Sequence, residues 1–407
     1  MKKNLIRLVS AVLAGSVCMG LSACGEPGNG GGDTEKFGIK VGLICLHDEN
    51  STYDLNFLNA MDEAKKQLGL SDDQVIIKKN IPESNDCKEA AADLADRGCN
   101  IIFADSFGHE PYLLEAAESN PDVQFCHATG TMAHTEKKAN FHNAFASIYQ
   151  GRYLAGIAAG LKLNEMIDDG KIKPEEAVMG YVGAYTYAEV ISGYTSFYLG
   201  AKSVCPSTTM KVQFTGSWYD ETAEKEAATT LLSKDCVLIS QHADSMGAPT
   251  ACENAGVPNV SYNGSTKDAC PNTFIVSSRI DWTPYYVYAI QCVLDGKDIG
   301  YDWTGDLAAG SVKLTEVNEQ AAAPGTQAAI DEAAAKLKSG ELHVFDTANF
   351  TVGGKMLESY LADVDTDPEY QPDTEAIKDG YFHESEFRSA PYFDVQIDGI
   401  EQLNTMF

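Results

Sequence analysis

The chain has 407 residues, and 44% of them are hydrophobic, which is enough to bury a sizeable core. Its length is too great for one unit of about 150 residues and fits two. It carries 59 Asp and Glu residues against 30 Lys and Arg, a formal net charge of −29 at pH 7. Nucleic acid is therefore excluded as an expected partner, because binding it needs a basic face.

The N-terminal segment 1–23 has the pattern of a secretory signal peptide, a basic start followed by an apolar run too short to span a membrane. It ends in Leu-Ser-Ala-Cys, which is similar to a bacterial lipobox and predicts diacylation of Cys24. An ordinary signal peptide with an incidental cysteine is the alternative. Residues 24–37 are rich in glycine and predict a flexible tether. We therefore expect a protein held at the extracytoplasmic face of the cell membrane by its lipid anchor only.

From residue 38 onward, short apolar runs alternate with helical patterns. The runs typical of strands are IKVGLICL (39–46), QVIIKK (74–79), NIIFAD (100–105), VQFCHAT (123–129), AVMGYVG (177–183), MKVQFTG (210–216), CVLISQ (236–241) and PNVSYN (258–263). The helical patterns between them cover 53–69, 86–98, 110–120, 188–203, 220–234 and 247–255. Such alternation predicts parallel sheets flanked by helices, and its restart after the fourth strand predicts two α/β lobes.

In open parallel sheets, ligands bind beyond the carboxyl ends of the strands. The loops that follow the predicted strands are 47–53, 105–108, 129–131, 184–187, 217–220, 242–245 and 263–266. These loops are rich in aromatic and hydrogen-bonding side chains. A cleft lined in this way suits a flat small molecule with polar edges.

The cysteines do not form a clear disulfide framework. Apart from one in the signal segment and Cys24, nine remain, an odd number without any C-x-x-C pair. Cys45, Cys126 and Cys236 lie in apolar runs and are expected to be small buried hydrophobes. One or two disulfides can form among Cys87, Cys99, Cys252 and Cys270, and the sequence leaves the pairing open.

Motifs for catalysis and metal binding are missing from the sequence. It has no G-x-S-x-G, H-E-x-x-H, G-x-x-x-x-G-K or G-x-G-x-x-G stretch, so neither an enzyme nor a cofactor is expected. The segment DVDTDPEY (363–370) has the early carboxylate spacing of a calcium loop. However, Pro368 takes the position that needs glycine, and Thr374 stands where the late Glu belongs, so we interpret it as a solvated acidic loop. No metal site is expected.

Longer stretches carry a family resemblance. They are NAFASIYQGRYLAGIAAG (143–160), MGYVGAYTYAEVISGYTSFYLGAKSV (179–204), TGSWYDETAEKEAATTLL (215–232), ISQHADS (239–245), VSSRIDWTPYYVYAIQCVLDGK (276–297) and SGELHVF (339–345). In order along residues 38–347, the chain resembles the basic membrane protein family. These are substrate-binding lipoproteins of ABC importers whose characterised members take up purine nucleosides or nucleobases.

The resemblance implies a two-lobed type I periplasmic-binding fold with the ligand cleft between the lobes. It places lobe one at 38–144 plus 264–308 and lobe two at 145–263 plus 309–407. It also implies a monomer that delivers a purine nucleobase or nucleoside to an ABC permease. A sensory receptor, or a binding protein for another solute such as a sugar, is the alternative.

The chain departs from the nucleoside-binding pattern in two loops. Residues 48–53 read Asp-Glu-Asn-Ser-Thr-Tyr, closer to a branch with Trp or Tyr in that loop than to the family's Asp-x-Ser-Phe-Asn. After the fourth strand, Ala128 or Thr129 stands where many members carry an Asp that meets the purine edge. The GSW stretch with Trp218 resembles the branch of the family for which a free purine base is the expected ligand. A nucleobase is therefore favoured over a nucleoside.

Three residues are the main ligand-binding candidates, each with a structural alternative. Tyr53 is expected to stack on the ligand, although it could pack as a first-turn helix residue. Trp218 is expected to stack as well, with a core position as the alternative. The carboxylate of Asp244 suits a ring N–H or a ribose hydroxyl, and equally suits an N-cap of the helix at 247–255.

Further candidates complete the predicted site. Those at the predicted cleft edges are Phe107, Tyr185, Asn263, Trp282 and Thr129. Those that either contact the ligand or cap helices are Asn50, Ser51 and Ser106. Asp105 and His242 are interpreted as structural or solvated.

Overall fold

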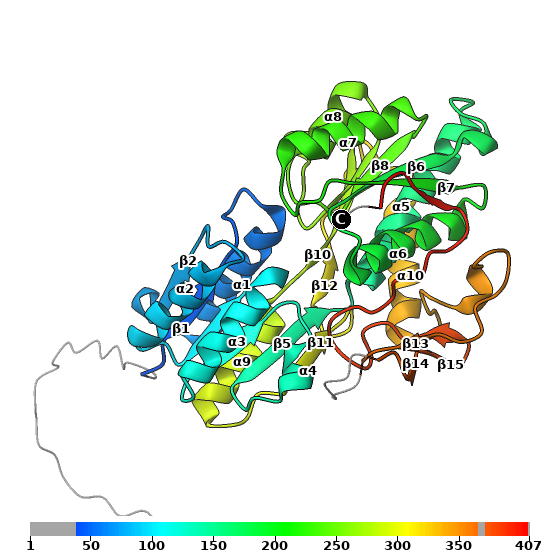
Figure 1. The fold of residues 1–407 in the computed structure, drawn as a ribbon. Helices are drawn as coiled ribbons and strands as arrows, with labels where there is room; N and C mark the ends of the chain where they lie inside the picture. The colour runs from blue at the N-terminus through cyan, green and yellow to red at the C-terminus, as the bar shows by residue number, and fades with distance from the viewer. Residues whose placement is uncertain (1–37, 365–370, 406–407) are drawn as a thin grey trace, which may run out of the picture. The chain divides into compact units, whose positions relative to one another are not determined.

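The computed structural model describes residues 38–364 and 371–405, and the part from Phe37 to Phe407 forms one compact unit. Two sheets, each with helices on both faces, make up this unit (Figure 1). The predicted signal peptide, Cys24 and the tether lie outside the described residues, as do residues 365–370 of the acidic segment.

The first sheet has six strands, all parallel. Their order is β11 (Asp302–Gly305), β5 (Phe141–Ala146), β4 (Gln124–His127), β3 (Ile101–Ala104), β1 (Val41–Ile44) and β2 (Val75–Lys78). β1 lies between two neighbours, and Val41 pairs with Val75 on one side and Ile101 on the other. The continuous apolar runs of β1 and β3 follow from this central place, because a parallel sheet is covered on both faces.

Helices cover both faces of the first sheet. On one face α1 (Thr52–Leu68) and α9 (Thr283–Asp295) share a core with Leu43 and Phe103. On the other face α2 (Asn85–Asp96) and α3 (Glu110–Ser119) pack on Ile102. The short helix α4 (Met132–Glu136) leads from β4 into β5. The sheet and these helices are called the first lobe below.

The second sheet has seven strands. Their order is β12 (Val312–Leu314), β10 (Phe274–Ile280), β9 (Asn259–Tyr262), β8 (Leu238–Gln241), β6 (Val178–Gly183), β7 (Thr209–Phe214) and β17 (Ile400–Gln402), with only β12 antiparallel to its neighbour. Its helices are α5 (Ile148–Asp168) and α6 (Ala188–Val204) on one face, α7 (Glu221–Ser233) and α8 (Gly247–Ala255) on the other, and α10 (Thr326–Ser339) packed on α5. This sheet and its helices are called the second lobe. The predicted two-lobed α/β fold is confirmed.

Glycines allow α5 and α6 to approach each other closely. A Cβ on Gly156 would lie 2.1 Å from the carbonyl oxygen of Phe197, and one on Gly200 would lie 2.0 Å from that of Tyr153. Both distances are far shorter than any van der Waals contact, so only glycine fits at these crossing points. The close pair holds α5 against the second sheet, which fixes the position of Arg152 behind the pocket described below.

The chain crosses between the lobes three times. It enters the second lobe after β5, returns to the first lobe with α9, and enters the second lobe again after β11. The second crossing therefore follows Ile280, whereas the predicted lobe boundary stands at residue 264. The difference is β10, which pairs in parallel with β9, as in Ser277 opposite Ser261, and so extends the second sheet.

The C-terminal segment after α10 contains short strand pairs and returns to the second sheet. The pairs are β13 (Leu361–Ala362) with β14 (Thr374–Glu375) and β15 (Ile377–Lys378) with β16 (Tyr381–Phe382). At its end β17 pairs in parallel with β7. The segment also reaches the first lobe, because the Ser389 N–H donates a hydrogen bond of 2.5 Å to the Asp302 carboxylate of β11.

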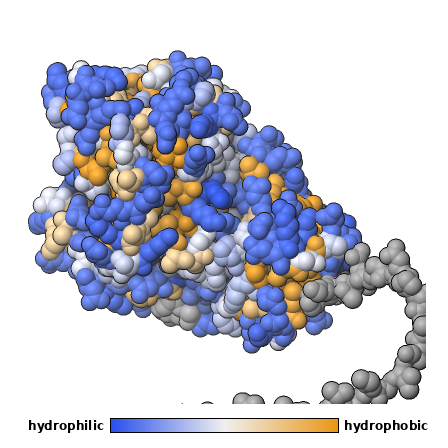
Figure 2. All heavy atoms as spheres, turned by 180° about the vertical axis from the view of Figure 1, so that it is seen from behind, coloured by the Kyte–Doolittle hydropathy of each residue, from blue (hydrophilic) through white to orange (hydrophobic). Residues whose placement is uncertain are grey.

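All nine cysteines of the described residues are buried free thiols, so none of the disulfides that the sequence allows is formed there. Figure 2 shows the face opposite to that of Figure 1, over which hydrophilic side chains dominate and hydrophobic ones gather in smaller patches. Within residues 38–364 and 371–405, no helix is long and apolar enough to cross a membrane.

Candidate functional site

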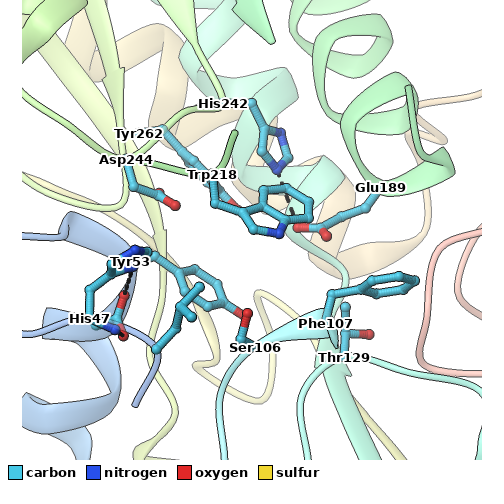
Figure 3. A pocket seen from close by; sticks show the side chains of 12 residues that line it. His47, Tyr53, Ser106, Phe107, Thr129, Glu189, Trp218, His242, Asp244 and Tyr262 are labelled. Carbon is cyan, nitrogen blue, oxygen red and sulfur yellow. Dashed lines mark hydrogen bonds and ion pairs between the residues drawn. The ribbon is translucent and has the colours of Figure 1, made fainter. Parts of the chain in front are cut away.

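A pocket lies between the two lobes, at the carboxyl ends of their strands (Figure 3). From the first lobe it is lined by Leu46, His47, Tyr53, Asp54, Ser106, Phe107 and Thr129. From the second lobe it is lined by Glu189, Trp218, His242, Asp244 and Tyr262.

The start of α1 builds one wall of the pocket. Ser51 is the N-cap of α1, because its hydroxyl oxygen accepts a hydrogen bond from the Asp54 N–H at 3.2 Å. The same hydroxyl donates to the Asp54 carboxylate at 2.6 Å, and the His47 N–H donates to that carboxylate at 2.8 Å. These bonds fix the first turn of α1, and with it Tyr53, at the pocket.

Aromatic rings provide the flat surfaces of the pocket. The Trp218 ring meets Tyr185 edge to face at 4.9 Å between centroids, and Tyr53 meets Phe57 in the same way at 4.9 Å. Neighbouring rings thereby hold Trp218 from the second lobe and Tyr53 from the first. Rings supported from behind in this way can stack on a flat ligand with little loss of rotamer freedom.

A buried chain of polar groups supports the second-lobe wall. The Arg152 guanidinium donates to the Gln241 carbonyl at 2.7 Å and to His242 Nδ1 at 3.0 Å, and it lies 3.2 Å from the centroid of the Tyr262 ring. Since arginine only donates, His242 Nδ1 accepts and Nε2 carries the proton toward Glu189, 3.3 Å away. Burial and the nearby Arg152 lower the pKa of His242, which fits this neutral imidazole.

The charged groups that line the pocket are acidic. Asp54, Glu189 and Asp244 present carboxyl groups, and no Lys or Arg is among the lining residues. The Asn263 amide donates to Asp244 at 3.2 Å. Burial, followed by the charges of neighbouring carboxylates, raises the pKa of Asp244 well above its usual range. The pocket therefore favours a ligand with N–H or O–H donors and disfavours an anion.

Two buried hydroxyl groups of the lining lack partners within the described part of the chain. They are Thr129 Oγ1 and the Tyr262 OH. Buried polar groups normally find a hydrogen-bond partner, and a group left alone is costly. A ligand with acceptors and donors on its edge would supply those partners.

Contacts between the lobes surround the pocket. The Thr52 N–H donates to the Asp244 carbonyl at 3.2 Å, and the Asn56 amide donates to the Asn263 carbonyl at 3.0 Å. At the other side, the rings of Phe107 and Tyr187 lie 5.1 Å apart. The lobes are therefore closed over the pocket.

The structure brings six of the predicted site residues to the pocket: Tyr53, Ser106, Phe107, Thr129, Trp218 and Asp244. Ser51 and Asn263 lie directly behind this lining, where they bond to Asp54 and Asp244. Tyr185 supports Trp218. The remaining two predicted residues lie elsewhere: Asn50 is exposed, and Trp282 is buried in the core, stacked on Phe57 at 4.4 Å.

Several lining residues were not predicted as ligand contacts. They are Leu46, His47, Asp54, Glu189, His242 and Tyr262. Asp54 lies one residue and Glu189 two residues beyond the predicted loops, inside the first helical turn, whereas Tyr262 is the last residue of β9. His242 follows a strand directly, as the strand-end rule requires, but was interpreted as structural. Extending each loop by two residues on both sides includes Glu189, Asp54 and Tyr262.

Two α/β lobes that close over a pocket at their strand ends define a two-lobed solute-binding protein of the type I periplasmic-binding fold. A solute-binding protein of an ABC transporter system from Conexibacter woesei has this fold, with a TM-score of 0.60 at 23% identity, over 75% of this chain and 98% of that one.

Residues 40–344 match the model of the Bmp family, described as ABC transporter substrate-binding protein PnrA-like, and the chain belongs to this family. The resemblance stated from the sequence is thus confirmed. A purine-binding protein of Brucella abortus is 30% identical over 75% of this chain and 83% of its own length. A protein of Haloferax volcanii, named as a candidate glucose-binding protein of an ABC transporter, is 28% identical over 75% of this chain and 76% of its own length.

Family membership establishes the general role. The chain is a substrate-binding protein that binds a small solute on the extracytoplasmic side and works with an ABC transporter, and it is not an enzyme.

Proposed function

We propose that this protein captures a purine nucleobase or nucleoside and delivers it to an ABC permease. The observation that carries the proposal is a closed pocket that combines aromatic walls with three carboxyl groups and no Lys or Arg side chain. A purine is flat on its faces and carries N–H donors on its edge, so stacking on Trp218 and Tyr53 and donation to Asp244 suit it. The purine-binding relative from Brucella abortus supports the same ligand class.

Between the two forms, a free base is the favoured ligand. Trp218 of the GSW stretch lines the pocket, and this stretch resembles the base-binding branch of the family. The pocket is closed by contacts between the lobes on two sides, which leaves a small flat ligand better enclosed than one with a ribose attached.

A sugar is the second candidate. Aromatic rings beside carboxylates also suit a sugar, whose apolar C–H face packs on a ring while its hydroxyls donate to the acids. The likeness to the candidate glucose-binding protein of Haloferax volcanii favours this alternative over other solutes.

Capture works through closure of the two lobes. A ligand that contacts both Tyr53 in the first lobe and Trp218 in the second binds the closed state more tightly than the open state. The ratio of these two affinities sets how far the ligand shifts the protein toward the closed state. The closed surface is then available to the permease, or to a signalling partner if the protein acts as a receptor. Diacylation of Cys24 and the tether at 24–37 would keep the binding unit near that partner, and no chemical step changes the ligand.

Calorimetric titration tests the proposal. The chain without its first 24 residues is freed of bound ligand by unfolding and refolding, and is titrated with adenine, guanine, hypoxanthine, xanthine, their nucleosides and glucose. Tight binding of a base and weak binding of its nucleoside supports the favoured form. Binding of glucose alone, or of no compound in the panel, contradicts the purine assignment.

A further inference from the structure

Three acidic side chains meet behind the first-lobe wall of the pocket. Cys45 follows β1, Asp54 lies in the first turn of α1, and Asp105 follows β3. The Cys45 Sγ and one carboxylate oxygen from each aspartate lie within 4.8 Å of one another. The three residues are 0%, 1% and 0% exposed.

No lysine or arginine forms an ion pair with this cluster in the described part of the chain. The ion-pair partners of its two carboxylates are histidines, His47 at 3.5 Å from Asp54 and His109 at 3.9 Å from Asp105. Buried anions without a cation beside them are strongly disfavoured. The groups must therefore either retain protons or share a bound cation.

His109 gives an independent indication of the second solution. Its Nε2 lies 2.8 Å from the Ile81 carbonyl, and because a carbonyl only accepts, Nε2 carries the proton. The other nitrogen, Nδ1, thus presents a lone pair, has no hydrogen-bond partner and lies 3.9 Å from Asp105 Oδ1. Asp105 Oδ2 likewise has no hydrogen-bond partner, and His109 is 0% exposed.

This arrangement is the one that metal-ligating histidines adopt. Such a histidine donates one ring N–H to a backbone carbonyl or a carboxylate, which fixes the ring and aims the other nitrogen at the metal. Here the aimed nitrogen faces the buried Asp105 carboxylate, whose Oδ1 accepts a hydrogen bond from the Leu46 N–H at 3.0 Å and whose Oδ2 has no hydrogen-bond partner.

We propose that Cys45, Asp54 and Asp105 bind a divalent cation of the zinc type, with the His109 ring against Asp105 at the edge of the site. Thiolate sulfur, imidazole nitrogen and carboxylate oxygen are the donors that zinc takes, whereas calcium and magnesium prefer oxygen ligands alone. On binding, the cation displaces the thiol proton of Cys45 and any proton held between Asp54 and Asp105, and these protons pass to the solvent.

Without a cation, the same groups hold their protons. Burial and the charge of Asp105 raise the pKa of the Cys45 thiol well above its usual range. Burial and the charge of Asp54 do the same to the pKa of the Asp105 carboxyl. The protonated cluster is therefore the competing arrangement, and the test has to separate the two.

The cluster also touches the ligand site. Asp54 lines the pocket and holds the first turn of α1 through Ser51, next to Tyr53. A bound cation would fix this wall. The sequence does not predict the site, because its donors come from three separate segments without any metal-ligand spacing.

Cobalt binding provides a direct test. The full chain is freed of metal with a chelator and titrated with Co²⁺, and separately with Zn²⁺, which should displace it. We expect one equivalent of Co²⁺ to give a thiolate-to-cobalt charge-transfer band, and the Cys45→Ser variant to lose it. Cys126→Ser is the matched control, a buried cysteine in β4 of the same sheet, and it should keep the band.

Two conservative variants keep the test decisive if Cys45→Ser does not fold. Asp105→Asn and His109→Gln should each weaken Zn²⁺ binding at least about tenfold in a competition titration. The proposal is overturned if the wild type binds neither metal in a one-to-one ratio, or if the cobalt band survives in Cys45→Ser. The proposal is also overturned if the wild type binds no metal and Asp105→Asn unfolds at a higher temperature than the wild type. That result would show that protons, not a cation, hold the cluster together.

Discussion

The backbone N–H of Thr52 and the carbonyl oxygen of Asp244 form a hydrogen bond of 3.2 Å, and the Thr52 hydroxyl donates to the same oxygen at 3.2 Å. Thr52 begins α1 in the first lobe, whereas Asp244 follows β8 in the second. The contact that closes the lobes is therefore one residue away from Tyr53 and includes a residue of the pocket itself. Closure and ligand capture depend on the same short segments.

Replacing Trp218 tests the stacking surface. Trp218→Ala should weaken binding of the preferred base by about 1–3 kcal/mol, roughly a five- to 150-fold rise in Kd, because stacking on an aromatic ring contributes that much. Trp218→Phe keeps a ring and should lose less. Trp303→Phe, in β11 and outside the pocket lining, is the control, and calorimetric titration measures all three. Unchanged affinity in Trp218→Ala would exclude stacking on this residue.

Replacing Trp282 distinguishes a core role of this residue from a ligand-binding role. It is 1% exposed and stacked on Phe57 of α1 at 4.4 Å, so Trp282→Ala should lower the free energy of unfolding by about 3–5 kcal/mol. The Kd of the folded fraction should stay near the wild-type value. Urea unfolding gives the first quantity, and titration gives the second. A large rise in Kd with little loss of stability would instead place Trp282 in the ligand contact.

The regular parts of the fold could be predicted from the sequence, because continuous apolar runs mark buried parallel strands. All eight predicted strands are present, within a few residues. Short strands with mixed composition, such as Asp302–Gly305 and Ile400–Gln402, carry no such signal. They form because a neighbouring strand offers free hydrogen-bonding groups, which is a property of the assembled sheet.

The candidate site could be predicted in part, and the reason is geometric. The strand-end rule leads to Trp218 and Asp244, since each lies in the loop that follows a strand. It cannot lead to Arg152, whose role depends on how α5 packs behind His242. The same limit explains Trp282, because only the packing of α9 on α1 shows that it belongs to the core.

An aromatic pair across the lobes should slow ligand release. Phe107 and Tyr187 are 42% and 39% exposed, although their rings lie 5.1 Å apart between the first and second lobes. Such pairs contribute about 0.5–1.5 kcal/mol, so Phe107→Ala or Tyr187→Ala should raise the dissociation rate roughly two- to tenfold. The association rate should change less, because affinity differences lie mostly in dissociation.

Stopped-flow measurement of release checks this pair. The double variant should release ligand about as fast as either single variant, because each substitution already removes the ring contact. Tyr301→Ala, an exposed tyrosine that precedes β11 and lies outside the lining, is the control. Fully additive effects of Phe107→Ala and Tyr187→Ala would show that the two rings act independently.

Glu224 should make stability depend on pH. It is 0% exposed in α7 and accepts hydrogen bonds from the Ser245 N–H beside Asp244. Burial raises its pKa from 4.5 to about 7. Between these values the folded state binds a proton that the unfolded state has lost, so stability falls as pH rises from about 4.5 to 7 and then levels. The loss is roughly 3 kcal/mol.

Urea unfolding at a series of pH values measures this loss. Burial also raises the pKa of Glu384 to about 7 and lowers the pKa of His109 and His142 to about 4, so the wild-type slope combines contributions of both signs, and the difference between variant and wild type isolates Glu224. Glu224→Gln should remove the contribution of Glu224 to this pH dependence while leaving a constant offset, since an amide cannot accept all the bonds that the carboxylate accepts. Glu226→Gln, exposed on the same helix, should keep the full slope. A Glu224→Gln variant with the wild-type slope would show that Glu224 titrates alike in the folded and unfolded states.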